Sequence, residues 1–326
     1  MATIKDVARE AGLTVTTVSR VLNNRGYISD NARRKVAEAM EKLNYQPNEV
    51  ARSLHKKSTK TIGVIVPHIR HPYFAEMISN LENAAYKEGY RILLCNTQSK
   101  EEKAKAYIEI CTGNRVAGII LFSGQVAVDT FMGLDIPVIT MERLLDSGTA
   151  AVECDNRTGG ALAAEKLIAC GCKNVILIGS TDTKVELPAD QRSIGFREVC
   201  DRHGVFYVEL DPEESAYNEL TYGDMMEKAL REYPKTDGVF ASSDVIAAQT
   251  LQVCNRLGIS VPEQMKIVGF DDVTLAQLTT PQLTTIHQPV KEMAQTAVRL
   301  LVDAANGRMV PKQTILPVQL IERGTA

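Results

Sequence analysis

The chain has 326 residues, of which 44% are apolar and 24% charged, with a net charge of −3, a balance typical of a soluble globular protein with two or three compact units. It contains no apolar run of eighteen residues and no apolar signal core in its first residues, so we expect neither a membrane span nor secretion. Seven cysteines without a CxxC pair argue against disulfides and zinc, and we expect a cytoplasmic protein with reduced thiols, no metal and no cofactor.

Charge is divided unevenly along the chain. Residues 1–60 carry 12 Lys and Arg against 6 Asp and Glu, a net charge of +6, whereas residues 61–326 carry 25 against 34, a net charge of −9. A basic head on an acidic body is expected when one end of a protein meets a polyanion such as nucleic acid. A solvated helical surface is the alternative explanation of the same charges.

The basic head begins with two short predicted helices. Apolar residues at helical spacing predict a helix over residues 4–11, with Thr3 as its N-cap and Asp6 completing an acidic capping box. Gly12 ends this helix, and Thr14 begins a second one with the sequence VTTVSRVLN. A tight turn between the two helices follows from this short connection.

The spacing of small and apolar residues in the head is typical of a helix-turn-helix. Ala8, Gly12 and Val18 fall at offsets that let the first two helices cross closely. A third helix is predicted over residues 30–43, with its apolar residues facing inward. The alternative is an ordinary three-helix bundle whose exposed threonines have no role.

In a helix-turn-helix, the outward residues at the start of the second helix enter the major groove. Arg20 is suited to a bidentate contact with guanine, while Val15 and the methyl group of Thr16 are suited to the methyl group of thymine. Thr3, at the start of the first helix, is also assigned to the DNA-contacting surface. The short hydrogen-bonding side chains suited to phosphates are Thr14, Thr17, Ser19 and Asn23.

The head resembles a known family of DNA-binding proteins. The stretch TIKDVAREAGLTVTTVSRVLN, followed by GYISDNARRKVAEAMEKLNYQPNEVARSL, resembles the LacI/GalR family of bacterial repressors. The GYIS motif and RILLCNTQSKEEKAKAYIE resemble the sucrose-repressor branch of that family. The resemblance implies a homodimer that binds pseudo-palindromic, double-stranded operator DNA with one head on each half-site.

The resemblance also gives an interpretation of NEVARSLHKK, residues 48–57, which is too short for a stable isolated helix. In the family this segment is a hinge that becomes helical when it pairs with its copy on operator DNA. By position, Leu54 corresponds to the wedge inserted into the minor groove, for which we expect a central CG step. The alternative is a linker with Leu54 packed on the next domain. The other hinge positions carried over are Asn48, Ala51, Arg52 and His55, the last standing where a lysine is frequent.

The acidic body alternates predicted strands and helices from residue 61 onward. Continuous apolar runs such as TIGVIVP and NVILIGS are typical of buried parallel strands, and helical segments separate them. Two successive series of this kind predict two doubly wound parallel sheets. Ligands of such sheets lie beyond the carboxyl ends of the strands, so the facing loops are expected to enclose a cleft.

The loops predicted at this cleft suit a sugar, which presents hydroxyl groups at its rim and apolar faces. Tyr73 and Phe74 provide aromatic rings for the faces. The polar groups suited to the rim are Asp155, Arg192, Asp271 and Gln288.

Residues 61–326 also resemble the ligand-binding core that the LacI/GalR family shares with periplasmic sugar-binding proteins. Carried over by position, Arg192 of RxxGF and Asp271 of GFDD are the main effector-binding candidates, and Ser243 stands where Asn or Thr is common. The alternative for each polar residue is strand-end capping or an ion pair between the lobes. The remaining positions carried over are His71, Ser123, Asp155, Gln288 and, as an aromatic residue of the second lobe, Tyr217.

The predicted fold is an all-α helix-turn-helix head joined to an α/β body of two doubly wound parallel-sheet subdomains, as in periplasmic binding proteins. The head is expected to end at residue 46, and a hinge helix and linker to follow. The expected bounds are 1–46 for the head, 47–60 for the hinge, 61–155 with 286–314 for the N-terminal subdomain, and 156–285 with 315–326 for the C-terminal subdomain.

The predicted function is a repressor of carbohydrate-utilisation genes. A sugar or sugar phosphate would change the closure of the two lobes, separate the hinges and so control DNA binding. Whether the effector induces or corepresses stays open, as does a phosphorylated protein as corepressor. An enzyme is disfavoured because the chain has no G-x-G-x-x-G, GxxxxGK[ST] or G-x-S-x-G. A secreted solute-binding protein would leave the basic head unexplained.

Overall fold

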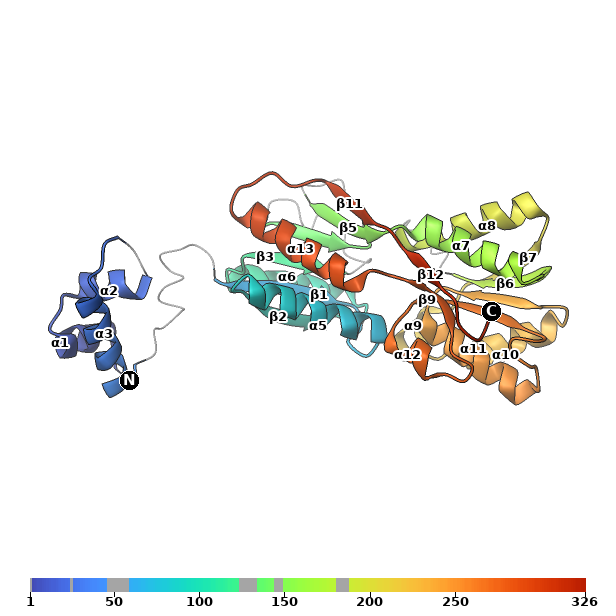
Figure 1. Ribbon diagram of the computed structural model, residues 1–326, viewed down its shortest axis with the longest axis horizontal. Coiled ribbons are helices and arrows are strands. Elements are labelled where there is room, and N and C mark those ends of the chain that lie inside the picture. Colours follow the sequence, from blue (N-terminus) through green and yellow to red (C-terminus); the bar gives the residue numbers. More distant parts are fainter. Residues whose placement is uncertain (1, 24–25, 46–58, 123–133, 144–148, 180–187) are drawn as a thin grey trace. The chain divides into compact units, whose positions relative to one another are not determined.

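The structure is a computed structural model that describes residues 2–23, 26–45, 59–122, 134–143, 149–179 and 188–326. It divides into two compact units, the head within Met1–Thr59 and the body Lys60–Ala326 (Figure 1). Six predicted site residues lie outside the described ranges, namely Asn48, Ala51, Arg52, Leu54, His55 and Ser123.

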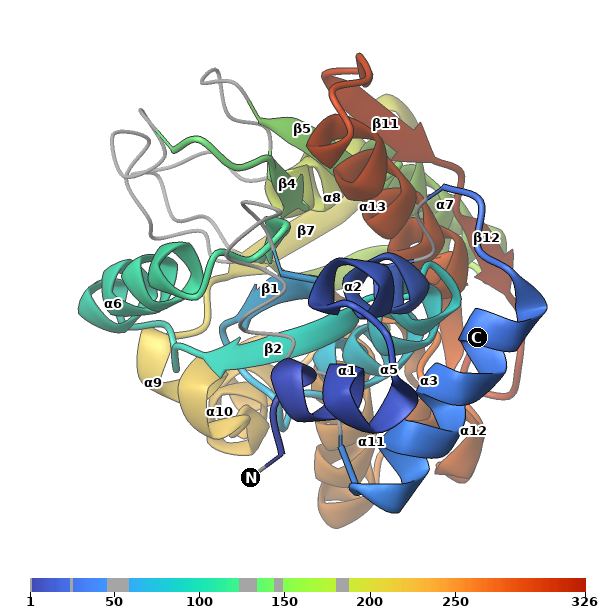
Figure 2. The same ribbon diagram turned by 90° about the vertical axis from the view of Figure 1, so that its left-hand side faces the viewer.

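The described part of the head contains the helices α1 (Ile4–Ala11), α2 (Val15–Asn23) and α3 (Asp30–Lys42), shown in blue in Figure 2. Their inward residues form one small core, which confirms the predicted apolar faces. The third helix ends one residue before the predicted bound. The buried residues of this core are Val7, Ala8, Ala11, Val18, Val36 and Ala39.

Local hydrogen bonds fix the ends of the first two helices. The carboxylate of Asp6 accepts from the backbone N–H and the hydroxyl of Thr3, at 3.0 and 2.7 Å, as the predicted capping box requires. These hydrogen bonds lower the pKa of Asp6. Gly12 ends α1 with φ +64°, a conformation that glycine adopts without strain. The hydroxyl of Thr14 then accepts from the N–H of Thr17 at 3.1 Å and caps α2.

The first subdomain of the body is a six-stranded parallel sheet in the order β11-β5-β4-β3-β1-β2 (Figure 1). Helices α5 (Pro72–Lys87), α6 (Glu101–Gly113) and α13 (Val290–Ala305) cover it, and α13 packs along α5. The strands are β1 (Thr61–Val66), β2 (Arg91–Asn96), β3 (Gly118–Leu121), β4 (Val138–Met141), β5 (Ala150–Cys154) and β11 (Gln313–Leu316).

Strand β1 shows why its sequence is a continuous apolar run. Ile62 and Val64 belong to the core shared with α5 and α13, whereas Ile65 belongs to a second core with Ile108 of α6. Helices therefore cover both faces of this sheet, and neither side of the strand meets water.

The second subdomain is a six-stranded sheet in the order β12-β10-β9-β8-β6-β7. Its strands are parallel, as the sequence predicted, and the added edge strand β12 (Gln319–Ile321) runs antiparallel to β10. The other strands are β6 (Asn174–Ile178), β7 (Phe206–Leu210), β8 (Gly238–Ala241), β9 (Lys266–Asp271) and β10 (Thr284–His287). The helices are α7 (Asn156–Ala169), the 3₁₀ helix η2 (Pro188–Asp190), α8 (Gln191–His203), α9 (Glu214–Glu219), α10 (Gly223–Glu232), α11 (Asp244–Leu257) and α12 (Thr274–Leu278).

The chain passes between the two subdomains after β5, after β10 and between β11 and β12. Two of the predicted boundaries fall inside strands and are corrected here. The boundary expected at 285/286 cuts β10, which pairs with β9 up to His287, so it lies after His287. The boundary expected at 314/315 cuts β11, which pairs with β5 up to Leu316. The sequence did not show where the strand pairing ends, because polar residues occur both within and after these strands.

Candidate functional site

The outward face of α2 carries the three residues predicted to contact bases. Val15 is 41% exposed, and Thr16 and Arg20 are exposed as well, while Val18 of the same helix is fully buried. The hydroxyl groups of Thr14 and Thr17 lie 2.8 Å apart and bond to one another. The remaining predicted positions lie nearby in sequence, with Ser19 half-buried and Asn23 the last residue of α2.

In the body, two glycines allow α7 and α8 to pack backbone to backbone. A Cβ atom at Gly160 would collide with the carbonyl oxygen of Arg192, and one at Gly195 would collide with the carbonyl oxygen of Arg157. This close approach explains the glycine of the RxxGF motif, since any side chain would push the two helices apart. It places Arg192, in the first turn of α8, against the start of α7.

The guanidinium group of Arg192 is fixed on three sides. Its Nε donates to Oδ1 of Asn156 at 2.7 Å, and one terminal nitrogen donates to the carbonyl oxygen of Ser242 at 2.9 Å. Its central carbon lies 3.7 Å from the centre of the Phe270 ring, a cation–π contact. The side chain is 9% exposed, so its charge is held in a largely dry environment.

Asp271, at the end of β9, is the carboxylate that faces this cation. It is 4% exposed, and its backbone has φ +115°, a conformation that is strained for a residue with a side chain. Gln288 donates from Nε2 to Oδ1 of Asp271 at 2.7 Å. Burial raises the pKa of Asp271 to about 7, and Arg192 opposes that rise. Strain and a buried charge at one position are typical of functional sites.

Aromatic side chains at the start of α5 form the opposite wall. The rings of His71 and Tyr73 both meet the ring of Phe74 edge to face, with ring centres 5.6 and 5.3 Å apart. Burial lowers the pKa of His71 to about 4, with His68 and Arg192 adding to the effect, so His71 is neutral at pH 7. Burial also raises the pKa of Tyr73, and the carboxylates of Glu142 and Asp271 act in the same direction.

Two buried polar atoms at this junction have no hydrogen-bond partner among the described residues. They are the hydroxyl oxygen of Tyr73 and Oε1 of Gln288, in side chains that are 6% and 1% exposed. Leaving such atoms unpaired costs free energy, so they point to a ligand that would bond them. Both lie near Asp271, which bonds Gln288 and acts on the pKa of Tyr73.

A second set of contacts joins the two subdomains directly. Nε2 of His68, in the loop after β1, lies 2.8 Å from Oδ1 of Asn218 at the end of α9, and 3.0 Å from the hydroxyl of Ser99. The rings of His68 and Tyr217 meet edge to face at 5.3 Å. Arg70 donates to the carbonyl oxygen of Asn218 at 3.4 Å. Tyr217, the aromatic residue predicted for the second lobe, thus contacts a residue of the first subdomain.

Two other predicted site residues have structural partners. The carboxylate of Asp155 caps α7 by accepting from the N–H and the hydroxyl of Thr158, at 3.0 and 2.7 Å. The hydroxyl of Ser243 caps α11 by accepting from the N–H of Ile246 at 3.4 Å. Both therefore make the strand-end capping contacts named above as the alternative to ligand binding.

Comparisons with known proteins identify the family. The profile of the family described as "Bacterial regulatory proteins, lacI family" matches residues 3–48, and that of the "Periplasmic binding protein-like domain" matches residues 164–326. The sucrose operon repressor of Streptococcus mutans is 36% identical over 321 residues, covering 98% of each chain. The ribose operon repressor of Halalkalibacterium halodurans is 35% identical over 327 residues, covering 100% of this chain and 97% of the relative. The chain belongs to the lacI family.

A solved structure extends this likeness to the whole fold. The lac repressor dimer bound to operator and the anti-inducer ONPF has a TM-score of 0.88 and 26% identity, covering 99% of this chain and 98% of that one. The helix-turn-helix head and the two-subdomain body predicted from the sequence are thus confirmed. This lacI-family protein is a DNA-binding transcriptional regulator and not an enzyme.

Two residues at this junction, Glu142 and Asn156, were not among the predicted site residues. Glu142 follows β4, and its carboxylate accepts from the N–H of Cys154 at 2.7 Å and from Nδ2 of Asn156 at 2.6 Å. Asn156, the first residue of α7, bonds Arg192 in turn. The signal that marked Asp271, an acidic residue directly after an apolar strand, is also present at Glu142 in PVITMER.

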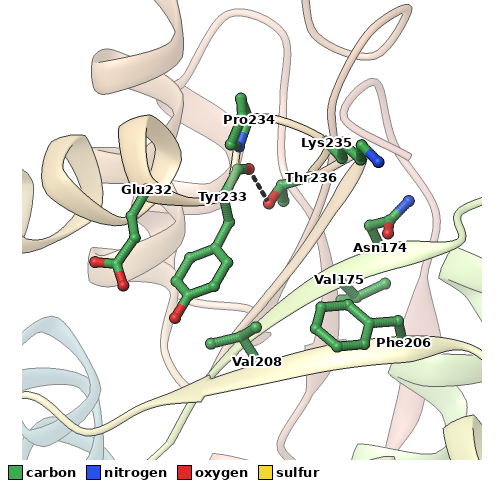
Figure 3. A pocket seen from close by; sticks show the side chains of 9 residues that line it. All are labelled: Asn174, Val175, Phe206, Val208, Glu232, Tyr233, Pro234, Lys235 and Thr236. Atoms are coloured by element: carbon green, nitrogen blue, oxygen red, sulfur yellow. Dashed lines mark hydrogen bonds between the residues drawn. The ribbon is translucent and has the colours of Figure 1, made fainter.

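A surface pocket of about 240 Å³ lies away from this site (Figure 3). It is lined by Asn174 and Val175 at the start of β6, by Phe206 of β7, and by Tyr233 and Thr236 beyond α10, where the hydroxyl of Thr236 donates to the carbonyl of Tyr233. This is the amino end of the parallel strands, opposite to the end where such sheets bind ligands.

Within the described ranges, no group of three His, Cys, Asp or Glu side chains is arranged to hold a metal ion, and no helix is long and apolar enough to cross a membrane.

Proposed function

We propose that this lacI-family protein is a repressor of carbohydrate-utilisation genes whose binding to operator DNA is controlled by a sugar held between its two subdomains. One observation carries the proposal: Arg192, Asp271 and Gln288 converge with aromatic residues of α5, beside two buried polar atoms without partners. A ligand with several hydroxyl groups both donates and accepts hydrogen bonds, and such a ligand would satisfy both atoms.

The charges of the site favour a neutral sugar over a sugar phosphate. Arg192 is already bonded to Asn156 and Ser242, and its charge opposes the rise that burial causes in the pKa values of Asp271 and Glu142. His71 is neutral at pH 7 and adds no positive charge. A phosphate group placed against Arg192 would also lie near the carboxyl groups of Asp271 and Glu142, and like charges in a dry site repel strongly.

The DNA-binding part of the proposal rests on the head. Val15, Thr16 and Arg20 stand outward on α2, in the arrangement that reads base edges in the major groove. We propose that two chains form a dimer on a pseudo-palindromic operator in the bacterial cytoplasm, with Leu54 of each hinge as the minor-groove wedge. The lac repressor structure, which contains a dimer on its operator, supports this arrangement.

Control of DNA binding would pass through the crossing segments. A sugar that contacts Arg192 and Asp271 in the second subdomain and Tyr73 in the first has a different affinity for the open and the closed arrangement of the two subdomains. Such a ligand shifts the population toward the closure that it prefers. Because β1 follows the hinge directly, a change in the position of the first subdomain changes the distance between the two hinges of a dimer.

The test is fluorescence anisotropy with a labelled palindromic duplex at fixed salt, because affinity for DNA falls steeply with ionic strength. Sucrose, D-ribose and D-fructose, with the corresponding sugar phosphates, are titrated into the complex. We expect one neutral sugar to change operator affinity in the wild type and to have no effect in Arg192→Ala. A response to a sugar phosphate alone would contradict the neutral-sugar assignment. A normal sugar response in Arg192→Ala would contradict the site.

A further inference from the structure

A chain of hydrogen bonds runs from the first subdomain to Arg192 in the second. Glu142, after β4, accepts from Asn156, which lies where the chain crosses from β5 into α7. Asn156 then accepts from Nε of Arg192 at 2.7 Å. Among the residues that the structure describes, no other chain of side-chain hydrogen bonds connects the guanidinium group of Arg192 to the first subdomain.

The side chain of Asn156 has no freedom to turn over. Its Nδ2 donates to Glu142 at 2.6 Å and to the carbonyl oxygen of Cys154 at 3.2 Å. Its Oδ1 accepts from Arg192 and from the thiol of Cys154, at 2.7 and 3.3 Å. All four hydrogen-bonding positions of the amide are therefore used, and the amide is 3% exposed.

Glu142 fixes which way this amide points. Its carboxylate only accepts hydrogen bonds, so the nitrogen end of the Asn156 amide must face Glu142 and the oxygen end must face Arg192. The backbone of Glu142 has φ +53°, an uncommon conformation for glutamate. Burial raises the pKa of Glu142, and Arg192 opposes that rise. Glu142 belongs neither to the predicted DNA-contacting residues nor to the predicted effector contacts. Its strained backbone and buried carboxyl group therefore need another explanation.

We propose that Glu142 is a positioning residue for the effector site: through Asn156 it orients Arg192 for the sugar and ties that orientation to the first subdomain. The proposal rests on the proposed function, because it assumes that Arg192 binds the effector. It goes further by naming the residues through which the first subdomain sets the geometry of a ligand contact in the second. Movement at the end of β4 then changes the direction in which Arg192 donates, and ligand contact with Arg192 acts back on β4.

The polarity of the chain gives a sharp test. In Glu142→Gln an amide faces two N–H donors, from Cys154 and Asn156, and one of them is left unpaired in either orientation. In Asn156→Asp two carboxylates face one another. In the double variant Glu142→Gln/Asn156→Asp, the glutamine oxygen accepts from Cys154 and its nitrogen donates to the aspartate, which still accepts from Arg192. The double variant keeps the net charge of the wild type and loses only the bond to the carbonyl oxygen of Cys154.

Sugar affinity of the full-length chain is measured by calorimetry with sucrose, D-ribose and D-fructose. We expect each single variant to bind the active sugar about tenfold or more weakly, since a charge-assisted hydrogen bond is lost. The double variant should bind more tightly than Asn156→Asp. Independent structural damage at the two positions would instead make the double variant weaker than either single variant, and that result would overturn the proposal.

Glu153→Gln is the matched control. Glu153 is a buried carboxylate of the same subdomain that also accepts from a side-chain amide, that of Gln313 at 3.1 Å. Among the described residues, no hydrogen bond joins it to Arg192 or Asn156. We expect sugar affinity within about twofold of the wild type in this variant. A tenfold loss in the control would show that any buried carboxylate of this sheet has the same effect, and would overturn the positioning role.

A measurement without any sugar separates this proposal from the proposed function. The ¹⁵N NMR signal of the Arg192 Nε–H is assigned by its absence in Arg192→Lys, and its hydrogen exchange is followed in the free protein. Exchange should be at least about tenfold faster in Glu142→Gln than in the wild type, and unchanged in Glu153→Gln. Unchanged exchange in Glu142→Gln would refute the orientation of Arg192 by Glu142, whether or not any of the sugars binds.

Discussion

Asp271 should make the protein less stable as the pH rises, and Asp271→Asn should remove that loss. The pKa of Asp271 is about 7 in the folded protein, against an ordinary value of 3.8. Between these values the folded protein holds a proton that the unfolded chain has released. The stability that this proton contributes is fully present below pH 4 and is lost as the pH rises through 7.

The magnitude follows from the two pKa values. Where only the folded state holds the proton, the free energy of unfolding falls by about 1.4 kcal/mol for each unit that the pH rises. Ionisation of Asp271 therefore lowers the free energy of unfolding by about 3 kcal/mol between pH 5 and pH 8. Asparagine tolerates the positive φ of this position and still accepts the hydrogen bond from Gln288, so it avoids the charge without a new strain. The variant should therefore become more stable relative to the wild type as the pH rises.

Thermal unfolding of the full-length chain at pH 5, 6, 7 and 8 is the assay. The difference in Tm between Asp271→Asn and the wild type should grow by about 5–10 °C from pH 5 to pH 8. The control is Asp303→Asn, which removes a carboxylate from a surface ion pair with Arg308 and should change little. A difference that does not depend on pH, or a variant less stable than the wild type at pH 8, would refute the reasoning.

Three further outcomes are expected. Leu54→Ala should lower the preference for a palindromic operator over scrambled DNA about tenfold in anisotropy titrations, since a buried leucine wedge is worth about 1.5–3 kcal/mol; an unchanged preference would remove the wedge role. His68→Ala should speed sugar binding and release by about threefold to tenfold in stopped-flow measurements, because it removes the contacts with Asn218 and Tyr217; equal rates would show that these contacts do not limit entry. Gly195→Ala should lower Tm by about 3–9 °C through collision of α8 with α7, whereas Gly113→Ala, with open space around it, should not; equal effects would contradict the packing argument.

The head could be predicted from the sequence almost residue by residue. Its helices are short, their ends are marked by Thr3, Gly12 and Thr14, and their apolar residues recur at helical spacing. These signals are local, so the sequence carries them without knowledge of the rest of the fold. The same holds for the continuous apolar strands of the body, which imply helices on both faces of a sheet.

The proposed effector site could be predicted only in part. The motifs RxxGF and GFDD made Arg192 and Asp271 candidates because they place polar residues at strand ends and helix starts, and in the structure Arg192 acts on the pKa of Asp271. At the crossing after β5, the prediction chose Asp155, but Asp155 caps α7, and the next residue, Asn156, bonds Arg192. A difference of one residue depends on the direction of the turn between strand and helix, which local sequence does not determine.

Contacts between the subdomains were beyond prediction for a related reason. His68 and Asn218 are separated by 150 positions, and only the relative placement of two sheets brings them within 2.8 Å. The crossing points after His287 and Leu316 likewise depend on where strand pairing stops. These features arise from tertiary packing, whereas helix caps and apolar periodicity arise from neighbours in the chain.

The central claim is that one sugar site and one operator site act on each other. It is tested by measuring four dissociation constants with the full-length chain at fixed salt: operator with and without the active sugar, and sugar with and without operator. Thermodynamic linkage requires the sugar to change operator affinity by the same factor by which the operator changes sugar affinity. We expect a common factor of about 5–150, lost in Arg192→Ala. A sugar that binds the chain while leaving operator affinity unchanged would contradict the claim.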